Sequence, residues 1–210
     1  MIPQPVNSPC KIGIMGGTFN PIHTGHLLLA ETALSSEGLQ KVMFIPSGKP
    51  YMKDEDSVLD ASHRQKMVEL AIADNPSFSV SDMEIRRLGN TYTSETLTIL
   101  KQEQPETEFY FILGADNLFT METWKEPEKI FSACTILAAV RNGVDNAQMQ
   151  EKCRELSDNY HAKIKLLSFP ETDISSTDIR MLIRQNKSIR YMVPEPVRRY
   201  IEKNQLYSAK

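Results

Sequence analysis

Short apolar runs alternate with amphipathic stretches along most of the chain. The apolar runs predict buried strands at Lys11–Met15, Lys41–Pro46, Phe78–Ser81, Phe109–Leu113, Cys134–Val140 and Lys163–Leu167. Apolar positions at helical spacing predict helices at Gly25–Leu34, Asp60–Asp74, Thr93–Gln104, Asn146–Ser157, Ser176–Gln185 and Pro196–Lys203. The polar stretch Ser47–Leu59, which contains Gly48 and Pro50, predicts a loop.

Strands that alternate with helices in this way predict right-handed βαβ units. The chain is therefore expected to form an α/β fold, with a Rossmann-like, doubly wound and mostly parallel sheet covered by helices on both faces. We find no internal repeat, low-complexity tract or obvious linker in the 210 residues. A single domain over residues 1–210, with its core at about 11–207, is the simplest organisation.

Composition narrows the range of functions. A net charge of −3, with Lys and Arg scattered, argues against a nucleic-acid partner, which needs a basic surface. No apolar run approaches the ~20 residues that cross a bilayer, and the first nine residues do not resemble a signal peptide. Three cysteines, Cys10, Cys134 and Cys153, without a C-x-x-C pair, favour a reducing cytoplasm over a disulfide framework or structural zinc site.

The first candidate motif, GGTFNPIHTGH, spans Gly16 to His26 between the first strand and the first helix. Gly16 and Gly17 predict a tight turn whose backbone can approach an anion closely. His23 and His26 are three residues apart and so share one helix face, where both could bind one phosphate. Each feature alone is common, and H-x-x-H could be half of a metal site, although no nearby Cys, Asp or Glu completes it. The string is neither a Walker A loop nor G-x-G-x-x-G.

The second candidate motif, ISSTDIR, spans Ile174 to Arg180 and opens a predicted helix. Ser175 with Asp178 fits a variant capping box, and Ser176 or Thr177 could also cap the helix. The motif could be no more than a cap followed by a surface arginine. Alternatively, hydroxyl groups, free N–H groups and one guanidinium converge there as a phosphate clamp.

Together these two strings resemble the signatures of the H-x-G-H nucleotidyltransferase superfamily, and within it the bacterial nicotinate-nucleotide adenylyltransferase family. The resemblance runs from about Lys11 to Tyr207. It implies an enzyme of NAD biosynthesis that transfers the adenylyl group of ATP to nicotinate mononucleotide, giving deamido-NAD and pyrophosphate. Mg²⁺ would arrive with ATP, bound mainly by phosphate and water, so no resident metal site is expected.

The resemblance also assigns residues to the two substrates. In the ATP site it places Gly16, Gly17, Thr18, Phe19, His23, His26, Gly114, Asp116, Ile174, Ser175, Ser176, Thr177 and Arg180. His23 and His26 would act on the α-phosphate, while Arg180 and the helix start would hold the departing pyrophosphate. These two histidines and Arg180 are the implied catalytic residues.

For nicotinate mononucleotide the resemblance implies Lys53, Tyr92, Thr93, Trp124 and Arg141. Trp124 would stack on the nicotinate ring, and the Tyr92–Thr93 segment would meet the carboxylate. Simpler roles remain open: Asp116 and Thr93 as helix N-caps, Trp124 in the core, and Lys53 as a solvated loop lysine.

The chain departs from the family pattern at two places. Its loop reads PSGKPYMK from Pro46 to Lys53, where the family usually has P-x-x-x-P-P-H-K, and Arg141-Asn142-Gly143 replaces R-P-G. These changes weaken the loop assignments for the second substrate and leave the ATP motifs untouched.

Other functions remain in view. Phosphopantetheine adenylyltransferase and the cytidylyltransferases belong to the same superfamily, and an idle nucleotide-binding module would keep the fold without the activity. A fragment of a tRNA synthetase fits less well, because the basic surface is missing. The sequence leaves open whether nicotinamide mononucleotide is also used, and it is compatible with a homo-oligomer.

Overall fold

The structure is a computed structural model that describes residues 9–49, 58–141, 146–169 and 172–208. At its centre lies a six-stranded sheet in the order β3-β2-β1-β4-β5-β6, and every neighbouring pair is parallel. The strands are β1 (Lys11–Gly17), β2 (Lys41–Pro46), β3 (Phe78–Val80), β4 (Glu108–Gly114), β5 (Thr135–Arg141) and β6 (Lys163–Phe169). This is the doubly wound order, and the direction of winding changes between β1 and β4. The predicted α/β, Rossmann-like sheet is confirmed.

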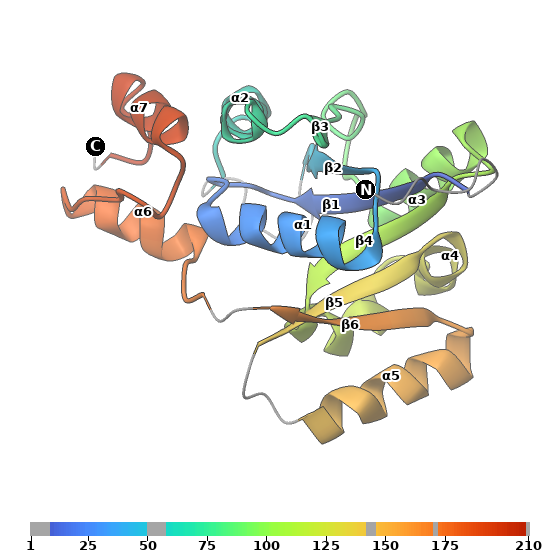
Figure 1. The fold of residues 1–210 in the computed structure, drawn as a ribbon. Coiled ribbons are helices and arrows are strands. Elements are labelled where there is room, and N and C mark those ends of the chain that lie inside the picture. Colours follow the sequence, from blue (N-terminus) through green and yellow to red (C-terminus); the bar gives the residue numbers. More distant parts are fainter. Residues whose placement is uncertain (1–8, 50–57, 142–145, 170–171, 209–210) are drawn as a thin grey trace.

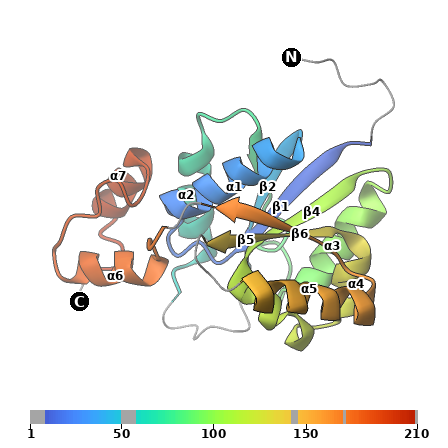
Figure 2. The same cartoon turned by 60° about the horizontal axis from the view of Figure 1, so that its bottom comes forward.

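Helices cover both faces of the sheet (Figures 1 and 2). One face carries α1 (Thr24–Glu37), α2 (Ala61–Ile72), α6 (Ser176–Arg184) and α7 (Glu195–Lys203). The other face carries α3 (Thr93–Glu103), α4 (Pro127–Ala133) and α5 (Asn146–Tyr160). Two short 3₁₀ helices, η2 (Ala115–Phe119) and η3 (Met121–Thr123), follow β4. None of these helices in the described residues is long and apolar enough to span a bilayer.

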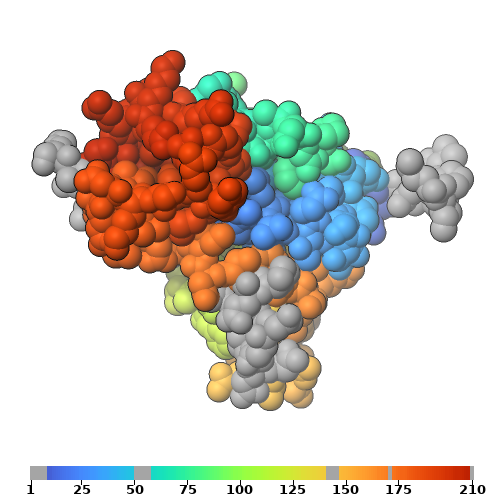
Figure 3. All heavy atoms as spheres, turned by 60° about the vertical axis from the view of Figure 1, so that its left-hand side comes forward, coloured from blue at the N-terminus to red at the C-terminus, as the bar shows by residue number. Residues whose placement is uncertain are grey.

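Each face of the sheet has its own buried cluster, because successive strand residues point to opposite sides. On β1, Ile14 joins the cluster under α3 and α4, and Met15 joins the cluster under α1 and α2. The second cluster continues into the C-terminal helices through Ile179, Val197 and Ile201. Apolar burial therefore fixes α6 and α7 against the α1 side (Figure 3).

The turn predicted at Gly16-Gly17 is wrong. Both glycines belong to β1, where they pair with Ile45 and Pro46 of β2, and the turn begins only at Thr18. Pairing with β2 outweighs the tendency of glycine to end a strand. A Cβ atom on Gly17 would lie 3.0 Å from the ring of Phe19, so the turn folds back over this residue.

The sequence did not predict η2, η3 or α4. All three are too short to show a helical period, although Pro127 at the start of α4 is a recognised signal for a first helical position. The other predicted elements are present, with ends displaced by a few residues.

Candidate active site

A cavity of about 280 Å³ opens at the carboxyl edge of the sheet, next to the change in winding direction. Such a place is where ligands bind in open α/β sheets. It is lined by His23, Gly25, His26, Leu29, Gly114, Ala115, Asp116, Asn117, Ala139, Phe169, Thr172 and Ile174. The structure therefore brings together five residues predicted for ATP: the two histidines, Gly114, Asp116 and Ile174.

The two histidines lie against each other at the start of α1. Their ring centroids are 3.7 Å apart with an angle of 34° between the planes. His23 is the N-cap, with extended backbone, and His26 is the third residue of the helix. The predicted shared face is confirmed, and it lies where the helix dipole favours an anion.

Hydrogen bonding sets the form of each imidazole. The backbone N–H of His23 donates to Nδ1 of His26 at 3.2 Å, so in neutral His26 the proton lies on Nε2. Burial lowers the pKa of His23 to about 4, which keeps this ring neutral at pH 7. Its buried Nδ1 has no hydrogen-bond partner among the described residues. An unpaired polar atom of this kind needs a partner from elsewhere.

Neighbouring residues hold the two rings in place. The ring of Phe19, which is 2% exposed, meets His26 edge-on with 5.1 Å between centroids. A Cβ atom on Gly25 would lie 3.1 Å from Nδ1 of His23 and 3.3 Å from Oγ1 of Thr172. Any larger residue here would force the side chain of His23 or Thr172 to shift by a few tenths of an ångström, so glycine lets both side chains approach closely.

The second motif, Ile174–Arg180, is hydrogen-bonded directly to the first, Gly16–His26. Ser175 caps α6 by accepting a hydrogen bond from the N–H of Asp178 at 3.1 Å, as the capping pattern predicted. Ser176 donates to the carbonyl of Pro21 at 2.8 Å and therefore does not act as a cap.

Arg180 reaches in the same direction. One terminal nitrogen donates to the carbonyl of Asn20 at 2.9 Å and the other to Oγ1 of Thr177 at 3.3 Å. The guanidinium is thus more than a solvated surface arginine. It ties the beginning of α6 to Asn20, just before His23 and 160 residues away in sequence.

The segment after β4 differs from one simple expectation. Gly114 is the N-cap of η2, and Asp116 lies inside this 3₁₀ helix, so the predicted cap role of Asp116 is wrong. Its exposed side chain instead lies at the wall of the cavity. The preceding residue, Ala115, is buried and fixes η2 against the sheet.

Of the residues predicted for the second substrate, Tyr92, Thr93 and Trp124 are described, and none of these three lines the cavity. Tyr92 is the N-cap of α3 and Thr93 is its first helical residue, so the predicted cap role of Thr93 is wrong. Trp124 is half-buried and meets Phe111 edge-on, with centroids 6.3 Å apart. Its neighbour Lys125 lies 4.0 Å above the ring of Tyr92, which brings these two segments together.

Two predicted residues cannot be placed. Lys53 lies outside the described residues, and for Arg141 only the backbone, at the end of β5, is described.

Sequence reasoning overlooked several residues that shape this edge of the sheet. Asn20 is buried, and its side-chain oxygen accepts from Tyr207 Oη at 2.8 Å and from the N–H of Leu59 at 3.3 Å. Asn117, Ala139, Phe169 and Thr172 complete the wall. Only the position of Asn117 and Ala139 near the ends of predicted strands could have indicated them.

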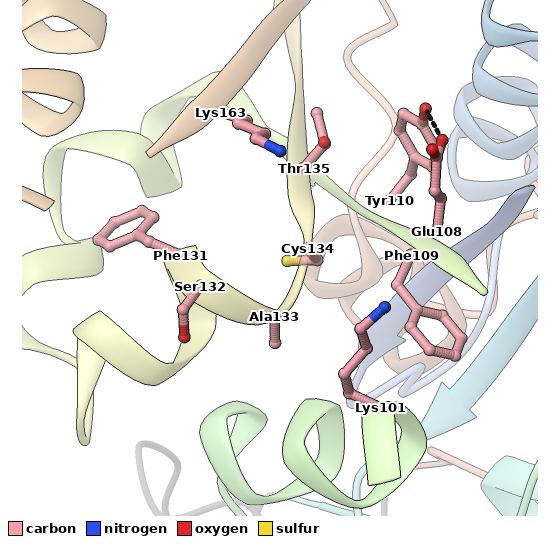
Figure 4. Close-up of a pocket in the computed structure, with 10 residues that line it drawn as sticks. All are labelled: Lys101, Glu108, Phe109, Tyr110, Phe131, Ser132, Ala133, Cys134, Thr135 and Lys163. Atoms are coloured by element: carbon pink, nitrogen blue, oxygen red, sulfur yellow. Dashed lines mark hydrogen bonds between the residues drawn. The ribbon is translucent and has the colours of Figure 1, made fainter. Parts of the chain in front are cut away.

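A second cavity, of about 330 Å³, lies at the opposite edge of the sheet, where β4, β5 and β6 begin (Figure 4). Lys101 lines it, but its amine already donates to the carbonyls of Pro105 and Thr107. Cys134 also lines it, and burial raises the pKa of this thiol to about 12, so it is protonated and unreactive at neutral pH. We assign no chemistry to this edge of the sheet.

The described residues contain no group of three or more His, Cys, Asp and Glu placed to hold a metal ion.

Comparisons with known proteins identify the family. The cytidylyltransferase-like family model matches residues 14–182. A protein of Lachnoclostridium phytofermentans, named probable nicotinate-nucleotide adenylyltransferase, is 50% identical and aligns over 94% of this chain and 98% of its own. Proteins of the same name from Moorella thermoacetica and Symbiobacterium thermophilum are 43% and 41% identical, over 94–96% of both chains.

Solved structures support the fold. The nicotinic acid mononucleotide adenylyltransferase of Plasmodium falciparum, complexed with NaAD, has a TM-score of 0.76 at 22% identity, covering 94% of this chain and 97% of its own. The fold and the docked motifs define a cytidylyltransferase-like nucleotidyltransferase. Within that class, the chain belongs to the nicotinate-nucleotide adenylyltransferase family.

Proposed function

We propose that this enzyme transfers the adenylyl group of ATP to nicotinate mononucleotide, giving deamido-NAD and pyrophosphate, with His23, His26 and Arg180 at the reacting phosphates. The observation that carries this proposal is the junction of the two motifs. The unpaired, buried Nδ1 of His23 lies beside His26, and α6 is hydrogen-bonded to the segment that immediately precedes them.

The phosphate of nicotinate mononucleotide is itself the nucleophile, so no Ser or Cys nucleophile and no general base is needed. It attacks the α-phosphorus of ATP in line, and the bond from that phosphorus to the bridging oxygen of pyrophosphate breaks. The chain contributes positioning and stabilisation of developing charge. His26 accepts at Nδ1 and donates from Nε2, and His23 supplies a second donor from its neutral ring.

The helix start of α6 holds the departing pyrophosphate in this scheme. Its first backbone N–H groups, the hydroxyl of Thr177 and the guanidinium of Arg180 all lie there. Gly16, Gly17, Thr18 and Phe19 contribute backbone at the end of β1, and Gly114 and Asp116 form the facing wall.

Nicotinate mononucleotide binds on the α3 side of the sheet edge. Trp124 stacks on the pyridine ring, and the first backbone N–H groups of α3, which begins at Thr93, bind its carboxylate. Lys53 stays a prediction for a substrate phosphate, and Arg141 stays a prediction for binding nicotinate mononucleotide.

ATP enters as its magnesium complex, and phosphate oxygens and water supply most of the ligands of the ion. The reducing cytoplasm suits the three free cysteines, and we place the reaction there.

The test is to incubate the enzyme with MgATP and either nicotinate or nicotinamide mononucleotide, and to identify the dinucleotide by mass spectrometry. We expect deamido-NAD and pyrophosphate, with kcat/KM at least ~10-fold higher for the nicotinate substrate, since donors aimed at a carboxylate clash with a carboxamide N–H. Use of both within about threefold, under 1 kcal/mol, would overturn the nicotinate assignment. CTP replaces ATP in a control reaction, because activity with CTP would favour a cytidylyltransferase.

A further inference from the structure

Arg64, in the first turn of α2, carries a buried positive charge that the proposed chemistry does not use. The residue is 1% exposed and is among the largest fully buried side chains of the described residues. Burial lowers the pKa of Arg64. A charge at this depth destabilises the fold unless hydrogen bonds compensate for the lost water, so its position demands a reason.

Among the described residues, the guanidinium donates only to main-chain carbonyls. Nε donates to Leu59 at 2.9 Å and Nη1 to Thr18 at 2.8 Å. Nη2 donates to Ser47 at 2.7 Å and to Gly48 at 2.9 Å. No carboxylate in the described parts of the chain forms an ion pair with it.

Those carbonyls belong to segments that serve different substrates. Thr18 begins the turn that leads to His23, whereas Ser47 and Gly48 follow β2. Beyond Gly48, the carbonyl of Lys49 accepts from the N–H of Thr91 at 3.4 Å, immediately before the start of α3. Arg64 therefore joins the turn that begins at Thr18, here called the ATP turn, to Ser47–Lys49 and the Thr91 that they contact, here called the mononucleotide segment. It adds to the backbone hydrogen bond that the N–H of Ser47 donates to the carbonyl of Gly17 at 2.9 Å.

Gly48 makes this joint tight. A Cβ atom there would lie 2.3 Å from the carbonyl oxygen of Glu84, a distance that real Cβ atoms do not show. The position of Gly48 is thus fixed from one side by Arg64 and from the other by the backbone at Glu84. Lysine could not replace the planar fork, because its single nitrogen cannot reach four carbonyls in three directions.

We propose that Arg64 is a positioning residue that fixes the ATP turn relative to the mononucleotide segment, so that the attacking phosphate and the α-phosphate meet in line. The proposal rests on the proposed function. Alignment of two reactants contributes mainly to the chemical step, and a small displacement costs a large rate factor. Loss of Arg64 should therefore lower kcat more than it weakens the binding of either substrate alone.

The test compares Arg64→Lys and Arg64→Met with Val68→Ala, a core truncation at a buried position one turn further along α2. Each variant is assayed for Tm, for kcat, and for the dissociation constants of ATP and nicotinate mononucleotide measured separately. We expect kcat of both Arg64 variants to fall at least ~10-fold, while each dissociation constant changes less than about threefold. Val68→Ala should lose comparable Tm and keep its kcat.

Three results would overturn the proposal: an Arg64→Lys enzyme with unchanged kcat, a loss confined to the dissociation constants, or an equal kcat loss in Val68→Ala. If the Arg64 variants do not fold, Gly48→Ala carries the test, since its Cβ displaces the same joint and should lower kcat with the same pattern. Failure of wild-type enzyme to make deamido-NAD would instead refute the proposed function itself.

Discussion

At the scale of single residues, the site depends on two imidazoles that are held in place by different interactions. His26 accepts a backbone hydrogen bond at Nδ1, and burial lowers the pKa of His23 to about 4, which keeps this ring neutral at pH 7. Each ring can donate one hydrogen bond to a phosphate oxygen from its N–H group. The positive charge at the phosphates then comes from Arg180. The pair therefore suits a phosphate that gains charge only in the transition state.

The buried position of His23 predicts a pH-dependent stability. Its pKa is about 4 in the folded chain, against 6.5 in the unfolded chain, so between these values the unfolded state binds the extra proton. The free energy of unfolding should fall as the pH decreases from about 6.5 to 4, by about 3 kcal/mol.

Urea unfolding at a series of pH values measures this effect, with His23→Ala and His161→Ala compared to wild type. His161 is exposed and serves as the control. Between pH 6.5 and 4, the free energy of unfolding should depend much less on pH in His23→Ala than in wild type or His161→Ala. If His23→Ala shows the same pH dependence as wild type, His23 is not buried in the neutral form.

The same two rings make a kinetic prediction. His23→Ala and His26→Ala should each fold and should lower kcat by on the order of 10²-fold or more, the usual cost of removing one transition-state donor. Steady-state rates with saturating MgATP and mononucleotide check this, after circular dichroism has shown a native spectrum. A folded variant with near-normal turnover would remove that histidine from the mechanism.

At the scale of elements, the proposed function assigns one helix start to each substrate. The start of α6 binds the phosphates of ATP, and the start of α3 binds the carboxylate of nicotinate mononucleotide. The start of α6 is capped by the side chain of Ser175 and is hydrogen-bonded to the carbonyl of Pro21 through Ser176, whereas the N-cap of α3 is Tyr92, whose side chain does not cap the helix. Helix starts offer free N–H groups and a positive dipole end, and both substrates are anions.

For α6, we predict that Arg180→Ala weakens ATP use much more than mononucleotide binding. The guanidinium lies on the first turn, between Thr177 and the carbonyl of Asn20. Arg184→Ala, one turn further along the same helix and exposed, is the matched control. Kinetics at varied ATP and varied mononucleotide separate the two effects, and equal losses for both substrates would favour a purely structural arginine.

For α3, Thr93→Pro removes one backbone donor without breaking the helix. Proline is tolerated at the first helical position, and the backbone of Tyr92 (φ −124°, ψ 139°) suits a residue that precedes proline. The preference for nicotinate over nicotinamide mononucleotide should narrow. Thr93→Ala keeps the N–H group and should keep the preference, so the ratio of kcat/KM values in the two variants identifies the donor.

The spacing of apolar residues predicted most of the helices and strands, because the period of each element is visible over a few neighbouring residues. The sequence also predicted the Ser175 cap, which needs only Asp178 three residues later. Prediction failed at Thr93, where the cap is Tyr92, and at α4, whose seven residues are too few to show a period. Boundaries and caps without a side-chain hydrogen bond leave little trace in the sequence.

At the scale of the whole molecule, residues that follow the C-terminal helices α6 and α7 form hydrogen bonds with residues on either side of His23. Tyr207 donates to Asn20, and the hydroxyl of Thr24 donates to the carbonyls of Tyr191 and Met192 at 3.0 Å. Figure 3 shows the surface of α6 and α7 next to the surface of α1. Neither these contacts nor the buried Arg64 could be predicted, because they join residues that only the fold brings together, and a helical arginine is normally exposed.

These hydrogen bonds predict a functional difference between two tyrosines of the same segment. Tyr207 donates to Asn20, next to the ATP turn, whereas Tyr200 shares a hydrogen bond of 2.9 Å with His63 of α2, away from the site. Replacement of either by phenylalanine removes one hydrogen bond and should lower the free energy of unfolding by about 1 kcal/mol. Only Tyr207→Phe should also raise the KM for ATP, by about three- to tenfold, because Asn20 then loses a partner that positions the carbonyl held by Arg180. Urea unfolding and ATP titrations of both variants measure the two quantities separately. If Tyr207→Phe loses stability but keeps the KM for ATP, or if Tyr200→Phe raises it equally, the C-terminal helices stabilise the fold without shaping the ATP site.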